Sequence, residues 1–198
     1  MSRKKNKLVF GVGINDADYA VQPTDPATGK QCVCSYYSKW QSMLKRCYYE
    51  RYQEKQPTYK GCYVCNEWLT FSVFKEWMEG QDWEGKELDK DLLDGKNKEY
   101  SPDKCVFVSN VLNKFVIDSG RARGEHMIGV SFYKLNGKFR SSCQNPITKK
   151  NETLGYFTSE MDAHLAWRAR KLELVDELLK NGYIDNLTIY SNLKEKYS

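Results

Sequence analysis

In the first half of the chain, apolar residues recur at intervals of three and four positions, which is the spacing of an amphipathic helix. Residues 36–52 predict one such helix, and residues 66–80 predict a second. The second places its large apolar side chains on one face: Trp68, Phe71, Phe74, Trp77 and Met78. We expect this face to lie in a buried core rather than to form a surface on which nucleic-acid bases stack.

A hairpin and a third helix follow these two helices. The segments "ELDKDLL" and "KCVFV" predict two strands joined by a polar loop that contains Gly95. Ser109 is a suitable N-cap for a helix from Asn110 to about Asp118, because a serine hydroxyl can accept a hydrogen bond from a free backbone N–H group.

In the second half of the chain, apolar and polar residues first alternate with a period of two residues, which is the spacing of a strand. The segments "MIGVSFY", "GKFRSSC" and "ETLGYF" predict three short strands. Residues 159–180 predict one long helix, with Ala163, Trp167, Leu174 and Leu178 on one stripe. The whole pattern predicts an α+β fold: a helical and hairpin module, followed by a three-stranded antiparallel sheet packed on one long helix.

These patterns divide the chain into five parts. Residues 1–31 are expected to form an N-terminal arm and residues 32–118 the first module. A glycine- and arginine-rich linker over residues 119–126 leads to the second module, residues 127–182. Residues 183–198 form a polar tail, which we expect to be partly ordered at best.

Composition excludes several classes of protein. The 198 residues are 40% hydrophobic, which is inconsistent with general disorder. No apolar run approaches the roughly 18 residues that a membrane helix needs. Seven cysteines, an odd number without a secretory signal, indicate a reducing compartment. We therefore expect a cytoplasmic protein with no membrane partner and no small-molecule substrate.

Positive charge gathers in the second module, although the net charge of the chain is only +5. One face of its predicted sheet is polar, because side chains alternate across a strand. That face carries Ser131, Tyr133, Lys138, Arg140, Ser142 and Gln144. Such a face can enter the major groove of DNA, and it can equally be a solvated outer face, as most antiparallel sheets have.

The second module resembles a known family over about 55 residues, in "IGVSFYKLNGKFRSSC" and "LGYFTSEMDAHLAWRARK". It is similar to the DNA-binding domain of plant ethylene-response factors, which also occurs in homing endonucleases of phages and mobile elements. In that family the sheet reads the major groove of duplex DNA. The resemblance implies the following DNA-binding residues: Ser131, Tyr133, Lys138, Arg140, Ser142, Gln144 and Thr153. Ser131 and Tyr133 stand where the plant domains usually carry arginine.

The first module, over roughly residues 34–116, resembles the front half of phage HNH-like endonucleases. In an HNH site a histidine is the general base, the preceding Asp and a residue on the helix hold one divalent cation, and an Asn braces the loop. The resemblance implies Asp89 and Asn113 as metal ligands. It places Lys90 in the general-base position and Lys104 in the bracing position. Lysine, with an ordinary pKa of about 10.4, is a poor base at neutral pH.

Two kinds of metal site follow as hypotheses. If the hairpin is an active nuclease, Asp89, Asp91 and Asn113 are candidate ligands of Mg²⁺. Alternatively, Asp89 and Asp91 share a metal with Asp94 or Asp103, or they are solvated carboxylates that flank a lysine.

Cys62 and Cys65 form a CxxC pair, which is half of a four-thiolate zinc site. Cys32 with Cys34, or Cys47 with Cys105, would supply the other half. These thiols can equally be small core residues.

The sequence supports two functional hypotheses. The first is a phage or mobile-element protein of the HNH homing-endonuclease type that binds duplex DNA, as a monomer or dimer in the bacterial cytoplasm, and hydrolyses it with Mg²⁺. The second is a catalytically inactive DNA-binding protein, regulatory or directed against a host process, on a nuclease-like scaffold. In a third version the basic face contacts RNA or an acidic protein.

Overall fold

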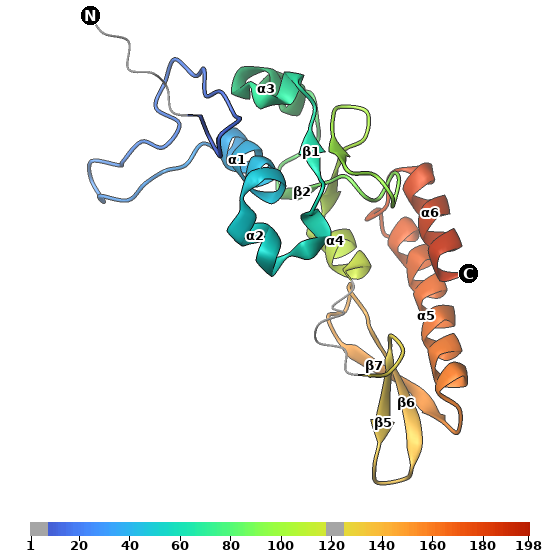
Figure 1. The fold of residues 1–198 in the computed structure, drawn as a ribbon. Helices are drawn as coiled ribbons and strands as arrows, with labels where there is room; N and C mark the ends of the chain where they lie inside the picture. Colours follow the sequence, from blue (N-terminus) through green and yellow to red (C-terminus); the bar gives the residue numbers. More distant parts are fainter. Residues whose placement is uncertain (1–7, 118–124) are drawn as a thin grey trace, which may run out of the picture. The chain divides into compact units, whose positions relative to one another are not determined.

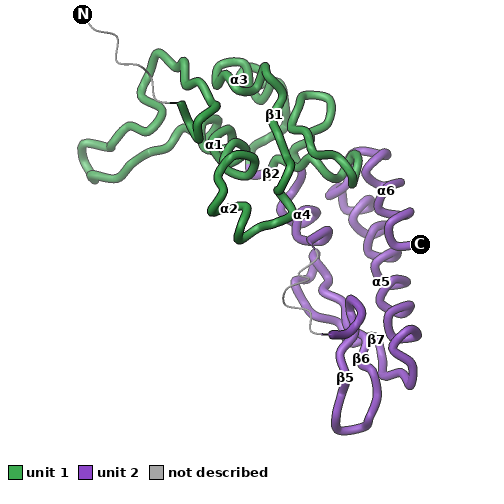
Figure 2. Tube along the Cα trace, in the orientation of Figure 1, with its two compact units in different colours: residues 1–84, 88–107 green, residues 85–87, 108–198 purple. Residues whose placement is uncertain are grey.

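The computed structural model describes residues 8–117 and 125–198 (Figure 1). The chain divides into two compact units: residues 1–84 with 88–107, and residues 85–87 with 108–198 (Figure 2). The elements of unit 1 are α1 (Ser35–Tyr48), α2 (Glu50–Lys55), the 3-10 turns η1 (Pro57–Tyr59) and η2 (Glu67–Leu69), α3 (Phe71–Glu79), β1 (Tyr63–Val64) and β3 (Glu99–Tyr100). Strands β2 (Lys86–Asp89) and β4 (Val106–Ser109) cross the boundary between the units. Unit 2 holds α4 (Asn110–Val116), β5 (Val130–Tyr133), β6 (Lys138–Gln144), β7 (Asn151–Phe157), α5 (Glu160–Lys180) and α6 (Leu187–Tyr197).

Unit 1 is organised around a buried aromatic core between α1 and α3. Trp40, Trp68 and Phe74 are completely buried, and Phe71 almost so. The indole of Trp40 donates a hydrogen bond to the backbone carbonyl of Trp68 at 2.7 Å, so its one polar group is satisfied inside the core. The prediction that these aromatic side chains form a core is confirmed.

The segment before α1 belongs to this core, so the expectation of a separate arm is wrong for the residues that the structure describes. Val9, Phe10, Val12 and Val21 pack against the core cluster. Ile14 is bonded on both sides: its N–H donates to Leu69 O at 2.8 Å, and its carbonyl accepts from Phe71 N at 3.0 Å. These apolar residues have a buried surface to cover, because short helices leave part of the aromatic core open.

The hairpin and the helix after it are present as predicted. Strands β2 and β4 pair with each other, and β1 pairs with β3 in parallel. Helix α4 begins at Asn110, and the hydroxyl of Ser109 accepts from the N–H of Leu112 at 3.1 Å, which is an N-cap bond.

Unit 2 is a three-stranded antiparallel sheet in the order β5-β6-β7, with α5 packed on one face. This α+β arrangement confirms the predicted fold class. Ser141 and Cys143 of β6 are buried on the side of α5, and so are Ala163, Leu174 and Leu178 of the helix. The predicted linker lies mostly outside the described residues. No helix in the described ranges is both long and apolar enough to cross a membrane.

Two contacts fix α5 against the sheet. The side chain of Arg170 on α5 is bonded to Glu152 on β7 at 2.7 Å, and it also bonds Glu173 and Glu177 on its own helix. Just before β5, Gly129 has a φ of +81° and lies directly against the indole of Trp167. A side chain on residue 129 would therefore meet Trp167 as well as an unfavourable backbone conformation.

The expectation of a poorly ordered tail is wrong, because residues 187–197 form α6. The side chain of Asn186 accepts bonds from the N–H groups of Thr188 and Ile189 and so begins the helix. Ile189, Leu193 and Tyr197 recur every four residues and are buried, and α6 contacts α5. Three apolar residues among polar ones are enough to fold this segment once α5 offers a surface to cover.

Replacement of Gly129 tests the packing of α5 on the sheet. A Cβ on residue 129 would stand 2.2 Å from Trp167 Cγ. We expect Gly129→Ala to lower the free energy of unfolding of unit 2 by about 2–4 kcal/mol, from overpacking together with left-handed backbone strain. The measurement is urea denaturation followed through Trp167 labelled with 5-fluorotryptophan.

Gly137→Ala is the matched control. Gly137 also has a positive φ, +66°, but a Cβ there would meet nothing within 4 Å. The free energy of unfolding of Gly137→Ala should fall by only about 1 kcal/mol, which is the cost of the backbone conformation alone. Equal losses in the two variants would contradict close packing between Gly129 and Trp167.

Candidate nucleic-acid interface

The face of the sheet opposite α5 is polar along all three strands. Strand register and the period of two place nine side chains on it: Ser131 and Tyr133 on β5, Lys138, Arg140, Ser142 and Gln144 on β6, and Asn151, Thr153 and Tyr156 on β7. None of the nine is acidic. We call this set the outer face.

Contacts between strands hold the centre of the outer face. Ser131 is the direct partner of Arg140 in the register, and Arg140 Nε donates to Ser131 Oγ at 3.3 Å. The rings of Tyr133 and Tyr156 meet with centroids 5.2 Å apart. Arg140 therefore lies between a hydroxyl and a pair of tyrosines, with its other guanidinium N–H groups available to an acceptor.

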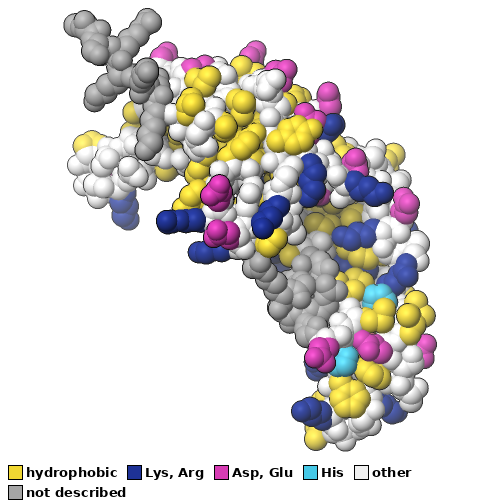
Figure 3. All heavy atoms as spheres, in the orientation of Figure 1, with side chains coloured by type: hydrophobic (Ala, Val, Ile, Leu, Met, Phe, Trp, Pro, Cys, Tyr) yellow, Lys and Arg dark blue, Asp and Glu magenta, His cyan; other side chains and the backbone are white. Residues whose placement is uncertain are grey.

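Positive charge surrounds this centre. Lys138 is exposed at one end of β6, and the turns that join the strands carry Lys134, Lys149 and Lys150, all exposed. The nearest acid of β7, Glu152, points to the other face of the sheet and is bound to Arg170. On the surface drawn in Figure 3, lysine and arginine are mixed with aspartate and glutamate. The net charge of +5 therefore does not by itself locate a nucleic-acid site.

The structure brings together all seven residues that the resemblance assigns to DNA. It adds Asn151 and Tyr156, which sequence reasoning missed. Tyr156 is three positions after Thr153, and a strict period of two would put the two on opposite faces. An irregularity in the register between Ser141 and Ser142 brings both onto the outer face, since Thr153 pairs with Ser142 and Tyr156 pairs with Arg140.

In the hairpin, Asp89 binds its own loop. Its Oδ1 accepts from the N–H of Asp91 at 2.8 Å and from the N–H of Leu92 at 2.9 Å. Burial raises the pKa of this carboxyl, and the two backbone bonds offset that rise only in part. Asp89 thus ends β2 and starts the turn that follows.

Lys90 is buried, with only 3% of its surface exposed. Its ammonium group donates to Asp91 Oδ1 and to the backbone carbonyl of Asn97, the latter at 3.0 Å. Burial alone would lower the pKa of Lys90, but the hydrogen bond and charge of Asp91 outweigh burial and raise it. A lysine held in this way stays protonated at neutral pH and cannot accept a proton from water, so this geometry does not support Lys90 as a general base.

Asn97 braces the loop of the hairpin. Its side-chain amide donates to Lys90 O at 2.9 Å and to Glu99 O at 2.8 Å, and its oxygen accepts from Glu99 N at 3.0 Å. Lys104, which stands at the bracing position of the HNH resemblance, instead forms an exposed ion pair with Glu99 at 2.6 Å. The sequence signal for Asn97 was weak: one asparagine in a polar loop.

Within residues 8–117 and 125–198, no three His, Cys, Asp or Glu side chains gather closely enough to hold a metal ion. Asn113 is half-buried on α4. The Mg²⁺ site on Asp89, Asp91 and Asn113 stays a prediction, and so do the catalytic roles of Asp89 and Asn113.

The cysteines of unit 1 are free thiols, and several are buried. Cys62 is buried and Cys65 half-buried, while Cys32 is exposed. Burial raises the pKa of Cys47 and of Cys105 to about 12, so both are neutral thiols at pH 7. This is how small core residues behave, and zinc on Cys62 and Cys65 stays a prediction.

Comparison of the chain with family models, with curated proteins and with solved structures finds no match.

The raised pKa of Asp89 predicts whether its replacement stabilises or destabilises the fold. Folding favours its protonated form, so its contribution to stability is present below the ordinary pKa of 3.8 and is lost as the pH rises through the folded-state pKa. Asparagine can accept the same two backbone bonds without charge. We expect Asp89→Asn to raise the free energy of unfolding at pH 7 on the order of 0.5 kcal/mol, with the gain disappearing in acid. Urea denaturation at several pH values measures it.

Asp91→Asn is the control of opposite sign. It removes the carboxylate that faces the buried ammonium of Lys90. It should lower the free energy of unfolding by about 1–3 kcal/mol at pH 7. A loss in Asp89→Asn as large as that in Asp91→Asn would show that the charge of Asp89 supports the fold, against the account above.

Proposed function

We propose that the chain binds duplex DNA through the outer face of unit 2. The proposal rests on the composition of that face. Of its nine side chains, two are cationic, seven are neutral hydrogen-bonding groups and none is acidic. A solvated face with no ligand has no need to exclude acids, and most protein surfaces mix both signs. A polyanion is the partner that such a face fits.

The geometry of the face suits a groove. A two-stranded ribbon fits the major groove of B-form DNA, and β-sheets serve as readers in several DNA-binding proteins. Lys138 and the turn lysines would contact phosphates. Arg140, at the centre, would reach base edges, where guanidinium pairs with guanine. Ser142, Gln144 and Thr153 supply both donors and acceptors, which base recognition needs.

For the hairpin, the bonding pattern favours the second functional hypothesis, a DNA-binding protein without hydrolysis. Lys90 holds its proton and is tied to Asp91 and Asn97, and Asp89 Oδ1 is used by backbone N–H groups. These bonds stabilise the loop and leave no group in the general-base position that could activate water. The resemblance to HNH endonucleases then describes a scaffold, on which nuclease activity would need a different base.

The outer face is tested by the double variant Lys138→Ala with Arg140→Ala. On a short random-sequence duplex at about 50 mM salt, we expect binding at least tenfold weaker, because two cations are removed from the contact. The slope of log K against log salt should fall by about 2. Fluorescence anisotropy measures both quantities.

Lys114→Ala with Lys180→Ala removes the same charge from exposed positions on α4 and α5, away from the sheet. It should leave affinity within about twofold. Equal weakening in both double variants would contradict the outer face as the contact. Binding of single-stranded RNA, or of an acidic polypeptide, in preference to the duplex would replace DNA by that partner.

Hydrolysis is tested with supercoiled plasmid and Mg²⁺ or Mn²⁺. We expect no nicking above the level of an EDTA control, because Lys90, the residue in the general-base position, stays protonated. The plasmid should carry DNA from the neighbourhood of the gene, since a homing enzyme ignores other sequences. Metal-dependent nicking that disappears in Asp89→Ala would refute the hypothesis that the protein is catalytically inactive. It would leave the proposal of DNA binding in place.

A further inference from the structure

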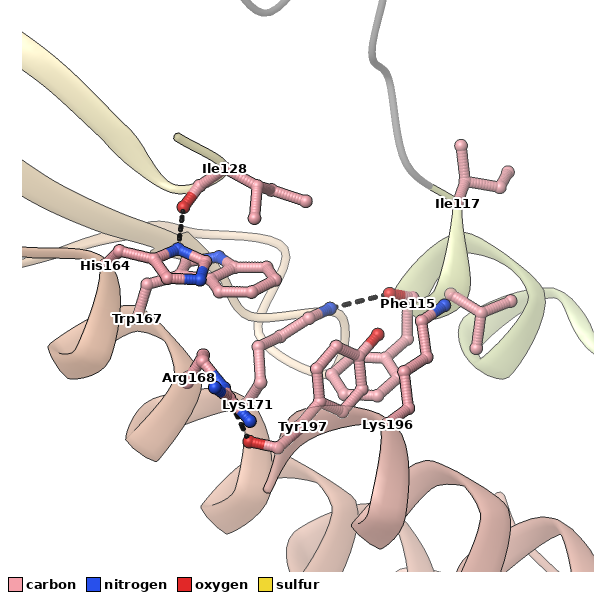
Figure 4. Close-up of a pocket in the computed structure, with 10 residues that line it drawn as sticks. Phe115, Ile117, Ile128, His164, Trp167, Arg168, Lys171, Lys196 and Tyr197 are labelled. Atoms are coloured by element: carbon pink, nitrogen blue, oxygen red, sulfur yellow. Dashed lines mark hydrogen bonds between the residues drawn. The ribbon is translucent and has the colours of Figure 1, made fainter. Parts of the chain in front are cut away.

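Unit 2 contains a pocket on the side of the helices. It has a volume of about 380 Å³ and is lined by residues of α4, α5, α6 and the segment before β5 (Figure 4). This volume lies in the range of small-molecule sites. The outer face is on the other side of the sheet from α5, so the pocket and the outer face are separate.

The pocket is lined by cations without carboxylates. Arg168, Lys171 and Lys196 line it, and none of the ten described lining residues is Asp or Glu. Two acids of α5 are engaged elsewhere: Asp176 with Lys194, and Glu177 with Arg170. A pocket of this charge favours an anion.

Part of this charge serves the fold. The ammonium of Lys171 donates to the carbonyl of Phe115 at 2.6 Å and lies 3.5 Å from the centre of the Phe115 ring. The Nε of Arg168 donates to the carbonyl of Tyr197 at 3.1 Å. Both carbonyls are at helix C-terminal ends, where cations commonly sit.

The remaining charge has no such role. The Nε bond uses one of the five N–H donors of Arg168, so the fork has further donors for an anion. Lys196 is exposed on α6 and lies over the ring of Tyr197 at 5.5 Å. In Figure 4 the side chain of Lys196 extends from α6 toward α4, along the pocket. Arg168 and Lys196 are therefore the groups that can bind a phosphate.

Beside these cations is an aromatic surface with one free acceptor. The ring of His164 is stacked on that of Trp167, with centroids 5.5 Å apart and an interplanar angle of 19°. Its Nδ1 is 2.9 Å from Ile128 O. A carbonyl only accepts, so Nδ1 carries the proton and Nε2 of the neutral ring is an acceptor. A ring with an N–H or amino donor matches this arrangement.

We propose that this pocket binds a nucleotide, with the phosphate on Arg168 and Lys196 and the base against Trp167 and His164. The shared chemistry is a nucleoside 5′-monophosphate, which can come from a free nucleotide or from the phosphorylated end of a DNA strand. The inference does not rest on the DNA contact of the outer face, and either can hold without the other.

The test is ¹⁹F NMR of the full chain labelled with 5-fluorotryptophan. Trp167 is the one tryptophan of unit 2, and Trp40, Trp68, Trp77 and Trp83 in unit 1 are internal references. Addition of deoxyadenosine monophosphate, up to about 5 mM, should shift the Trp167 signal saturably and leave the other four in place. Deoxyadenosine or inorganic phosphate alone should give at most a tenth of that affinity, because each lacks one half of the contact.

Lys196→Ala is the informative variant, since it removes an exposed side chain and should keep the Trp167 signal at its ligand-free position. We expect it to weaken nucleotide binding at least about tenfold. Lys194→Ala, on the same helix but paired with Asp176, should bind as the parent does. No shift of Trp167 with the nucleotide, or an equal shift with phosphate alone, would overturn the proposal.

Oligonucleotides with a 5′-phosphate and with a 5′-hydroxyl separate the two sources. A shift of Trp167 by the phosphorylated strand at lower concentration than the mononucleotide would identify a DNA end as the ligand. A shift by the mononucleotide alone would identify a free nucleotide. Both results support the pocket, and both are independent of variants in the outer face.

Discussion

The covering of one face of the β5-β6-β7 sheet by α5 is the constraint on which unit 2 depends. A three-stranded sheet has two faces, and one helix can bury only one of them. Trp167 against Gly129 and Arg170 against Glu152 fix which face that is. Side chains an even number of positions from Arg140 along β6 then point away from α5, on the outer face, whatever their chemistry. The outer face therefore exists because of how α5 packs, and its lack of acids is the feature that packing does not explain.

Lys90, which the resemblance to HNH endonucleases would place in the general-base position, serves the fold of the hairpin. Its ammonium satisfies the carbonyl of Asn97, while the amide of Asn97 satisfies the carbonyl of Lys90, so the two residues close the loop from both sides. Such a pair needs a protonated lysine, because a neutral amine would lose the attraction of Asp91. The bonds that stabilise this hairpin thus keep Lys90 protonated.

Much of this fold is predictable from the sequence, because long amphipathic patterns set helices and alternation sets strand faces. Trp68, Phe71 and Phe74 were expected in a core and lie in one, and Ser109 caps the helix that it was expected to cap. Residues 187–197 were not recognised as a helix, since Ile189, Leu193 and Tyr197 are isolated among polar residues and fold only against α5. Tyr156 was missed because register is a property of paired strands, and the irregularity beside Ser142 cannot be read from β7 alone. The pocket at Trp167 is lined by α4, the segment before β5, α5 and α6, which span some 80 residues of the chain, so no local pattern indicates it.

We propose that duplex DNA contacts the outer face, and the decisive measurement is amide chemical-shift mapping of the full chain with a short DNA duplex. We expect the largest changes on Ser131, Arg140, Ser142 and Thr153, whereas the amides of α6 and of the aromatic core in unit 1 should stay unchanged. Changes confined to unit 1, or spread evenly over both units without a maximum on β5, β6 and β7, would contradict it.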